Sequence, residues 1–154
     1  MSRAIPEGSE GVIPYLCIDG ASDAIELYKK VFGATEIYWM AQPDGRIGHA
    51  EIRIHGRPIY IADEFAEMGF HGPKHYGGTP VMLHLYVEDV DATMKAAEES
   101  GAKITRPAET QFYGDRGGSL LDPYGHNWYV STHVEDVSED EIQRRAQEKL
   151  GKKE

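Results

Sequence analysis

An internal repeat constrains the fold of this sequence more than any other feature. Residues 13–34 and 82–102 each contain a short apolar segment, an acidic turn, apolar residues at helical spacing and a closing glycine. The two copies are offset by 69 residues with one gap. A repeat at this spacing is typical of two copies of one supersecondary unit. The sequence therefore predicts two modules of the same topology.

Each predicted helix has residues suited to its ends. Ser22 or Asp19 can cap the first helix, and Gly33 can end it in the left-handed conformation that glycine adopts readily. Asp89 and Gly101 bracket the second helix in the same way. The two helices are therefore expected to begin and end close to these residues.

After each helix, apolar and polar residues alternate, which is typical of half-buried strands. Strands are expected at residues 34–42, 46–55 and 58–64 in the first half, and at 103–106, 118–121 and 126–133 in the second. Residues 43–45 and 122–125 have the composition of hairpin turns. Each half thus reads as a βαβββ module, and the chain as an α+β fold.

The expected organisation has five parts: an N-terminal arm at 1–10, a first module at 11–67, a linker at 68–80, a second module at 81–135, and a polar C-terminal helix and tail at 136–154. The linker assignment depends on the glycine and proline content of that segment. Ser138 and Glu141 have the spacing of a capping box, which predicts a helix near the C-terminus.

Strand alternation also sorts side chains between the two faces of each sheet. In residues 48–54, the apolar side chains of Ala50, Ile52 and Ile54 are expected to pack under a helix, which leaves His49, Glu51 and Arg53 on the opposite face. The same reasoning places further side chains on the face away from the helices: Ile13, Tyr15, Cys17, Met82, His84 and Tyr86.

The charge balance argues against several classes of partner. Sixteen Lys and Arg residues against 26 Asp and Glu residues give a net charge of −10, which repels nucleic acids and anionic membranes. One cysteine, Cys17, cannot form an internal disulfide, and it is expected to be a small buried apolar group. No segment has the length and hydrophobicity of a signal peptide or a membrane span. The expectation is a cytoplasmic protein with no nucleic-acid or membrane partner.

Several segments carry a family resemblance that extends from about residue 12 to residue 133. Residues 13–34 resemble the opening of the vicinal oxygen chelate superfamily, which includes glyoxalase I, bleomycin and fosfomycin resistance proteins and extradiol dioxygenases. Residues 121–126 are similar to its closing hairpin, Asp-Pro-x-Gly. Residues 48–51, 62–64 and 111–116 look most like the uncharacterised branch similar to the phosphonate-operon accessory protein.

This resemblance implies a U-shaped mixed sheet around a pocket, commonly completed by a second subunit, so a homodimer is expected. Metal-using members place one ligand on each of four strands, and strand register carries those places to Ile13, Tyr60, Met82 and Tyr129. None of these side chains is a good ligand for a divalent ion. The expectation is therefore no metal at the usual positions and no cofactor, as in the metal-free resistance proteins that bind a drug.

The candidate catalytic residues are His84, His49 and Glu51. Two histidines and a carboxylate are the ligands of one type of non-haem metal site, and they also suit acid–base catalysis. The alternative is that they line a polar pocket, where Glu51 orients a histidine or pairs with Arg53. The candidate ligand-binding residues are Tyr15, Tyr60, Tyr86, Tyr113, Arg116 and Tyr129.

Arg116 is the candidate for recognition of an anionic ligand, because it lies in the glycine-rich segment 111–118, expected to be a loop at the pocket mouth. The alternative is a pair between Asp115 and Arg116, or between either of them and a partner subunit. His71 and His75 are read as solvated loop residues, because the intervening Gly-Pro pair argues against a helix.

Two functions follow from these residues. In the first, the protein binds a planar or amphipathic small molecule in an aromatic pocket. In the second, it is an enzyme that uses His84 or His49 with Glu51 for proton transfer, or with a metal for lyase, isomerase or dioxygenase chemistry.

Overall fold

A computed structural model describes residues 2–151, apart from the side chains of Glu36 and Ile37. The chain divides into two compact units at the boundary between Pro80 and Val81. This boundary coincides with the end of the segment expected to be a linker. Among the described residues, no helix is both long and apolar enough to cross a membrane.

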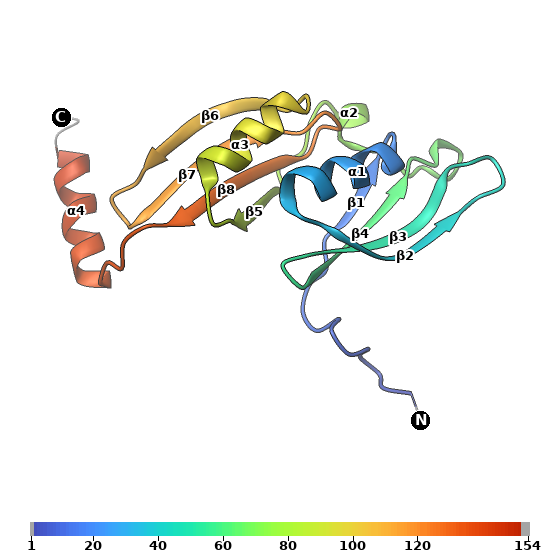
Figure 1. Cartoon of the computed structure of the whole chain (residues 1–154), viewed down its shortest axis with the longest axis horizontal. Coiled ribbons are helices and arrows are strands. Elements are labelled where there is room, and N and C mark those ends of the chain that lie inside the picture. Colours follow the sequence, from blue (N-terminus) through green and yellow to red (C-terminus); the bar gives the residue numbers. More distant parts are fainter. Residues whose placement is uncertain (1, 152–154) are drawn as a thin grey trace. The chain divides into compact units, whose positions relative to one another are not determined.

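The first unit contains a βαβββ module (Figure 1). Its elements are β1 (Tyr15–Ile18), α1 (Ala21–Phe32), β2 (Thr35–Ala41), β3 (Ile47–Ile54) and β4 (Arg57–Asp63). The sheet order is β1-β4-β3-β2, with β1 parallel to β4 and the other pairs antiparallel. After β4 come a short 3-10 helix, η1 (Ala66–Met68), and the single-turn helix α2 (Pro73–Tyr76).

The second unit repeats this topology. Its elements are β5 (Met82–Tyr86), α3 (Val90–Glu99), β6 (Lys103–Thr110), β7 (Asp115–Leu121), β8 (Asn127–His133) and the C-terminal helix α4 (Glu139–Gly151). The order β5-β8-β7-β6, with β5 parallel to β8, matches the first sheet. The predicted α+β fold of two βαβββ modules is confirmed.

The repeat extends to the register of the strands and to the start of the helices. Tyr15 pairs with Tyr60 in the first sheet, and the residues 69 positions later, His84 and Tyr129, pair in the second. Asp63 Oδ1 accepts a hydrogen bond from the backbone N–H of Ala21, and 69 positions later Thr132 Oγ1 accepts one from Val90. In each module, a side chain at the end of the last strand therefore caps the helix.

The expected cap of the first helix was wrong. No side chain of the N-terminal flank caps α1, whose N-cap residue is Gly20, and the acceptor is Asp63 instead of Ser22 or Asp19. Parallel pairing of β1 with β4 brings the distant carboxylate beside the helix start. Two other predicted helix ends are confirmed. Gly33 has the left-handed conformation after α1, and the Asp89 carboxylate accepts a hydrogen bond from the backbone N–H of Ala92 at the start of α3.

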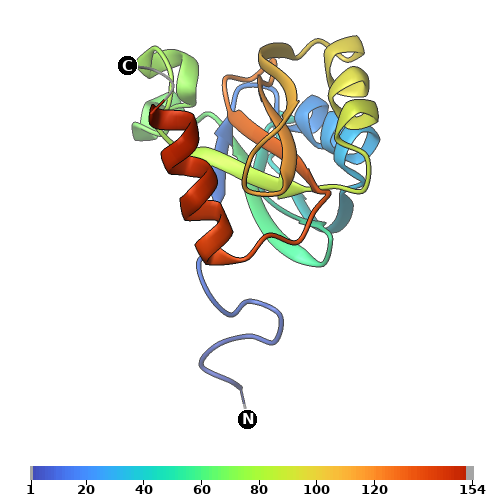
Figure 2. The same cartoon turned by 90° about the vertical axis from the view of Figure 1, so that its left-hand side faces the viewer.

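One helix packs against one face of each sheet, and the apolar core lies between them (Figures 1 and 2). In β3, Ala50, Ile52 and Ile54 are buried, whereas His49 and Glu51 are partly exposed on the other face, as predicted. The fully buried large side chains of the second core include Trp128, Leu120, Val90 and Val130. The opposite face of each sheet is left for polar and aromatic side chains.

Strand β7 is longer than predicted because residues 115–117 were read as part of a glycine-rich loop, and β6 extends to Thr110 instead of ending at Arg106. A Cβ on Gly117 would lie 2.7 Å from the Tyr129 hydroxyl, and one on Gly118 would lie 2.7 Å from the backbone oxygen of Arg106. Both glycines therefore permit close packing within a strand. The predicted C-terminal helix is present as α4, and Arg145 holds it to the β6–β7 turn by donating to the backbone oxygen of Phe112.

Candidate functional site

Three side chains of the first unit form a hydrogen-bonded chain. The Tyr15 hydroxyl lies 2.8 Å from His49 Nδ1, and His49 Nε2 lies 3.2 Å from Glu51 Oε1. A carboxylate only accepts hydrogen bonds, so His49 Nε2 carries the proton of the second bond. In a neutral imidazole Nδ1 is then an acceptor, and the Tyr15 hydroxyl donates to it. Two predicted catalytic residues and one predicted ligand-binding residue are thus brought together.

The aromatic rings around this chain hold it in place. Tyr60 packs edge-on against Tyr15, with ring centroids 5.8 Å apart, and against His49, with centroids 5.0 Å apart. Burial, together with the nearby Cys17, raises the pKa of the Tyr15 phenol. Tyr15 therefore stays protonated at neutral pH and is available for hydrogen bonding.

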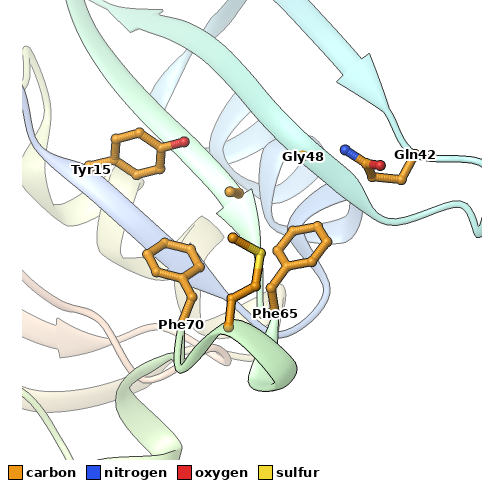
Figure 3. A pocket seen from close by; sticks show the side chains of 7 residues that line it. Tyr15, Gln42, Gly48, Phe65 and Phe70 are labelled. Atoms are coloured by element: carbon orange, nitrogen blue, oxygen red, sulfur yellow. The ribbon is translucent and has the colours of Figure 1, made fainter.

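A cavity of about 370 Å³ opens beside Tyr15. Its lining residues are Tyr15, Gln42, Gly48, Ala62, Phe65, Met68 and Phe70. Figure 3 shows the Phe65 and Phe70 rings on one side and Gln42 and Gly48 on the other, with the Tyr15 hydroxyl directed toward Gly48. A mostly apolar and aromatic wall with a few polar groups is typical of small-molecule sites, and the volume lies within their usual range.

The loop after β4 forms the aromatic wall and has its own hydrogen bonds. The backbones of Phe65 and Phe70 bond to each other in both directions, at 2.9 and 3.1 Å. Glu64 Oε1 accepts from the backbone N–H of Gly72 at 2.7 Å. The Arg46 guanidinium lies 4.2 Å above the Phe65 ring centre and also bonds to Glu67 at 2.8 Å. These contacts fix the two phenylalanine rings against the cavity.

The aromatic wall was not predicted from the sequence. Phe65 was placed at the end of the first module, and Met68 and Phe70 in the linker at residues 68–80, with no role assigned to them. The sequence does contain an indication of it, because residues 65–70 carry three large apolar side chains in a segment otherwise rich in glycine and charged residues. Loop residues of this kind are more often exposed at a site than buried in a core.

In the second unit, the predicted ligand-binding tyrosines gather around His84. His84 Nε2 lies 2.8 Å from the Ser131 hydroxyl, and the His84 ring stacks on Tyr86 with centroids 4.9 Å apart. Tyr129 packs edge-on against His84, and its hydroxyl lies 3.4 Å from that of Tyr113. This hydrogen bond, together with burial, raises the pKa of Tyr113 to about 12. All these side chains lie on the face away from α3.

A buried carboxylate extends this cluster toward the C-terminus. Asp115 accepts from the Tyr86 hydroxyl at 2.6 Å and from His133 Nδ1 at 2.8 Å, and His133 Nε2 lies 2.7 Å from Asp136. Burial raises the pKa of Asp115, but the hydrogen bonds from Tyr86 and His133 outweigh it and hold that pKa below its usual range. The hydrogen bonds to Asp115 and Asp136 raise the pKa of His133. His133 was not identified from the sequence.

Replacing Asp115 with asparagine is expected to lower the pKa of His133, because the amide no longer supplies a negative charge. In the wild type the folded-state pKa lies above the reference value of about 6.5, so the stabilisation from His133 is present below that pH and is lost as pH rises through the folded-state pKa. NMR titration of the imidazole protons measures both pKa values. A wild-type His133 pKa at or below the reference value contradicts the expectation.

The expected place of Arg116 was wrong. Asp115 and Arg116 belong to strand β7, so the loop is only the turn at residues 111–114. The Arg116 guanidinium binds both carboxylate oxygens of Asp91, in the first turn of α3, at 2.8 and 2.9 Å. Neighbouring residues of a strand point to opposite faces, so Arg116 lies on the helix side and Asp115 on the side of His84. They do not pair with each other.

The reading of His71 and His75 was wrong in part, because His75 belongs to α2, although it is exposed, as predicted, and His71 lies before the helix. Their rings stack with centroids 3.7 Å apart and planes 7° from parallel, across the single turn of α2. Pro73 is compatible with this helix because it occupies the first turn, where a missing N–H costs no hydrogen bond. The reading of Cys17 is supported: it is buried, and burial, with nearby Glu64, raises the pKa of its thiol to about 12.

The residues present do not fit a metal ion at the family's usual positions. Ile13 and Met82 offer no oxygen or nitrogen ligand, and Tyr60 and Tyr129 pack by their rings against Tyr15 and His84. Within the part of the chain that the structure describes, no group of three or more His, Cys, Asp or Glu side chains is arranged to hold a metal. The alternative metal set combines residues of both units, His49 and Glu51 from the first and His84 from the second.

Comparison with known proteins yields one family and several relatives. The family model described as the Glyoxalase/Bleomycin resistance protein/Dioxygenase superfamily matches residues 15–130. The uncharacterized protein Mb0911c of Mycobacterium bovis is 41% identical over 133 residues, which are 84% of this chain and 88% of the relative.

Two solved structures are similar in fold. The PhnB protein of Bacillus cereus, described as a putative 3-demethylubiquinone-9 3-methyltransferase, has a TM-score of 0.66 and 16% identity, over 80% of this chain and 99% of that one. The fosfomycin resistance protein FosX of Listeria monocytogenes has a TM-score of 0.62 and 16% identity, over 87% of this chain and 98% of that one.

Proposed function

Because the chain belongs to the glyoxalase/bleomycin resistance protein/dioxygenase superfamily, we propose that it binds a planar or amphipathic small molecule in the cavity of its first module. The observation that carries this proposal is the cavity itself, about 370 Å³ with Phe65 and Phe70 facing Gln42 and Gly48. Binding requires no metal at the family's usual positions. Burial of a planar ligand against the aromatic wall supplies the affinity, and the Tyr15 hydroxyl orients the ligand.

The Phe70→Ala variant tests this proposal with N-phenyl-1-naphthylamine, an uncharged fluorescent probe that brightens in apolar surroundings. The wild type is expected to bind the probe saturably, and Phe70→Ala to weaken binding about tenfold or more, because the variant removes one of the two rings of the wall. Fluorescence titration gives both dissociation constants.

Tyr76→Ala is the matched control, since Tyr76 is a well-exposed aromatic residue on α2 and does not line the cavity. This variant is expected to bind the probe as the wild type does. Thermal unfolding of both variants checks that they remain folded. Equal affinities of Phe70→Ala and the wild type, or no saturable binding at all, would show that the cavity is not the binding site.

A second function, acid–base catalysis, is favoured by the chain from Glu51 through His49 to Tyr15. In this reading His49, oriented by Glu51, exchanges a proton with a substrate in the cavity through the Tyr15 hydroxyl. Deuterium exchange at the acidic carbon of 2-indanone, followed by NMR, tests it. If His49→Gln abolishes the exchange while the fluorescent probe still binds, the result supports the enzymatic function.

The homodimer and the cytoplasmic location expected from the sequence remain predictions.

A further inference from the structure

The hydrogen-bonded chain of the first unit determines what the Tyr15 oxygen can offer a ligand. Glu51 accepts a hydrogen bond from His49 Nε2, and Nδ1 of the neutral His49 ring accepts one from the Tyr15 hydroxyl. The phenol oxygen is then left with its lone pairs and no free proton. Because Tyr15 is about half exposed (49%) and lines the cavity, a bound ligand meets it as a hydrogen-bond acceptor.

Among the residues that the structure describes, the cavity wall offers no positive charge for an anion. None of its seven lining residues is basic. Arg46 touches the wall through Phe65, but its guanidinium is already paired with Asp44 and Glu67, each at 2.8 Å. An anionic ligand would have to compete with these two carboxylates.

Negative charge instead surrounds the cavity. Glu64 belongs to the loop that forms its wall, and Glu51 acts on it through His49 and Tyr15, whereas Arg46 offsets the charge of Glu67. The chain as a whole carries a net charge of −10. In a partly desolvated site, these charges oppose an anion and favour a cation. The Phe70 ring adds a face that attracts cations, whereas the Arg46 guanidinium already lies over the Phe65 ring.

Building on the proposed function, we infer that the cavity selects arylalkyl amines, in which a planar ring carries an alkylamine group protonated at neutral pH, over aromatic anions of the same size. The ring packs on Phe65 and Phe70, and the ammonium N–H donates to the Tyr15 oxygen. Arg116, the sequence-based candidate for holding the ligand if it were anionic, has its guanidinium paired with Asp91 on the helix side of the second sheet.

A matched series of three naphthalenes tests the ligand class by displacement of N-phenyl-1-naphthylamine at neutral pH. The series is 1-naphthylmethylamine as the cation, 1-naphthylmethanol as the neutral compound and 1-naphthaleneacetate as the anion. The amine is expected to bind about tenfold or more tightly than the anion, with the alcohol between them. Because the three share one ring system, the differences report charge and hydrogen bonding.

Two variants locate the origin of the preference. Tyr15→Phe removes the acceptor, and Glu51→Gln removes the charge that orients His49, so both are expected to reduce the ratio of amine to anion affinity several-fold. Asp23→Asn is the control, since it removes the same charge from an exposed residue at the start of α1, on the other side of the sheet. Asp23→Asn is expected to keep the wild-type ratio.

The outcomes separate the two proposals. If the fluorescent probe binds and is lost in Phe70→Ala, but the anion binds as tightly as the amine, the ligand class is wrong and the cavity remains the binding site. An unchanged ratio in both Tyr15→Phe and Glu51→Gln also overturns the inference, because the preference then has another origin. If the probe does not bind the wild type, both proposals fail.

Discussion

Replacing Asp63 with alanine is expected to lower the free energy of unfolding of the first module by about 2–5 kcal/mol. Asp63 Oδ1 accepts from the backbone N–H groups of Gly20 and Ala21, and Oδ2 accepts from that of Ile47 at 2.7 Å. Ala21 and Ile47 are fully buried, so alanine would leave their N–H groups without this acceptor and away from water. Each orphaned buried donor costs about 1–3 kcal/mol.

Two further variants define this effect. Asp63→Asn keeps one accepting oxygen but turns an amide N–H toward a backbone donor, so it is expected to be intermediate. Asp23→Ala removes an exposed carboxylate from the first turn of α1, where charge interacts only weakly with the helix, and is expected to cost well under about 1 kcal/mol. Urea unfolding followed by circular dichroism gives the three values. If Asp63→Ala lowered the free energy of unfolding no more than Asp23→Ala does, the hydrogen bonds of Asp63 would not stabilise the module.

The second large effect is expected at Asp122, in the β7–β8 turn. Its Oδ1 accepts from the backbone N–H groups of Tyr124 and His126, both at 2.9 Å, and its Oδ2 accepts from Trp128 Nε1 at 3.0 Å. Asp122 and Trp128 are both buried. Asp122→Ala removes the acceptor of the indole N–H and two bonds of the turn, at a cost of about 2–4 kcal/mol to the second module.

A double-mutant cycle with Trp128→Phe isolates the indole bond. Phenylalanine has no N–H, so Asp122→Ala is expected to cost about 1 kcal/mol less in the Trp128→Phe background than in the wild type. Asp44→Ala is the control in the β2–β3 turn, where the carboxylate is exposed, and a much smaller loss is expected. Strictly additive losses in the cycle would mean that the indole bond does not stabilise the module.

Local features of the fold could be read from the sequence because they depend on residues a few positions apart. The alternation through residues 48–54 identified Ala50, Ile52 and Ile54 as buried and His49 and Glu51 as facing away. Gly33 ends α1 and Asp89 caps α3, as the sequence predicts. The resemblance to the superfamily is confirmed by the family model, and the repeat by the matching topology of the two sheets.

Glycine and proline content gave a wrong prediction of secondary structure in two places. Gly117 was read as a loop residue, and Gly118 as the end of that loop and the start of a strand, although in β7 they allow the close approach of Tyr129 and of the backbone of β6. Proline 73 was read as excluding a helix, although it occupies the first turn of α2. A glycine or proline signals a turn only when its neighbours in space do not require it for another reason.

The sequence by itself determined the topology of each module, the face of each strand and the presence of a polar and aromatic surface opposite the helices. Only the tertiary structure decided which of those side chains meet. The bond from Tyr15 to His49, the cap from Asp63 to Ala21, the pairing of Arg116 with Asp91 and the aromatic wall facing Gly48 all join different elements. Periodicity places a side chain on a face, but its partner depends on strand order and register, which set the distances between residues remote in sequence.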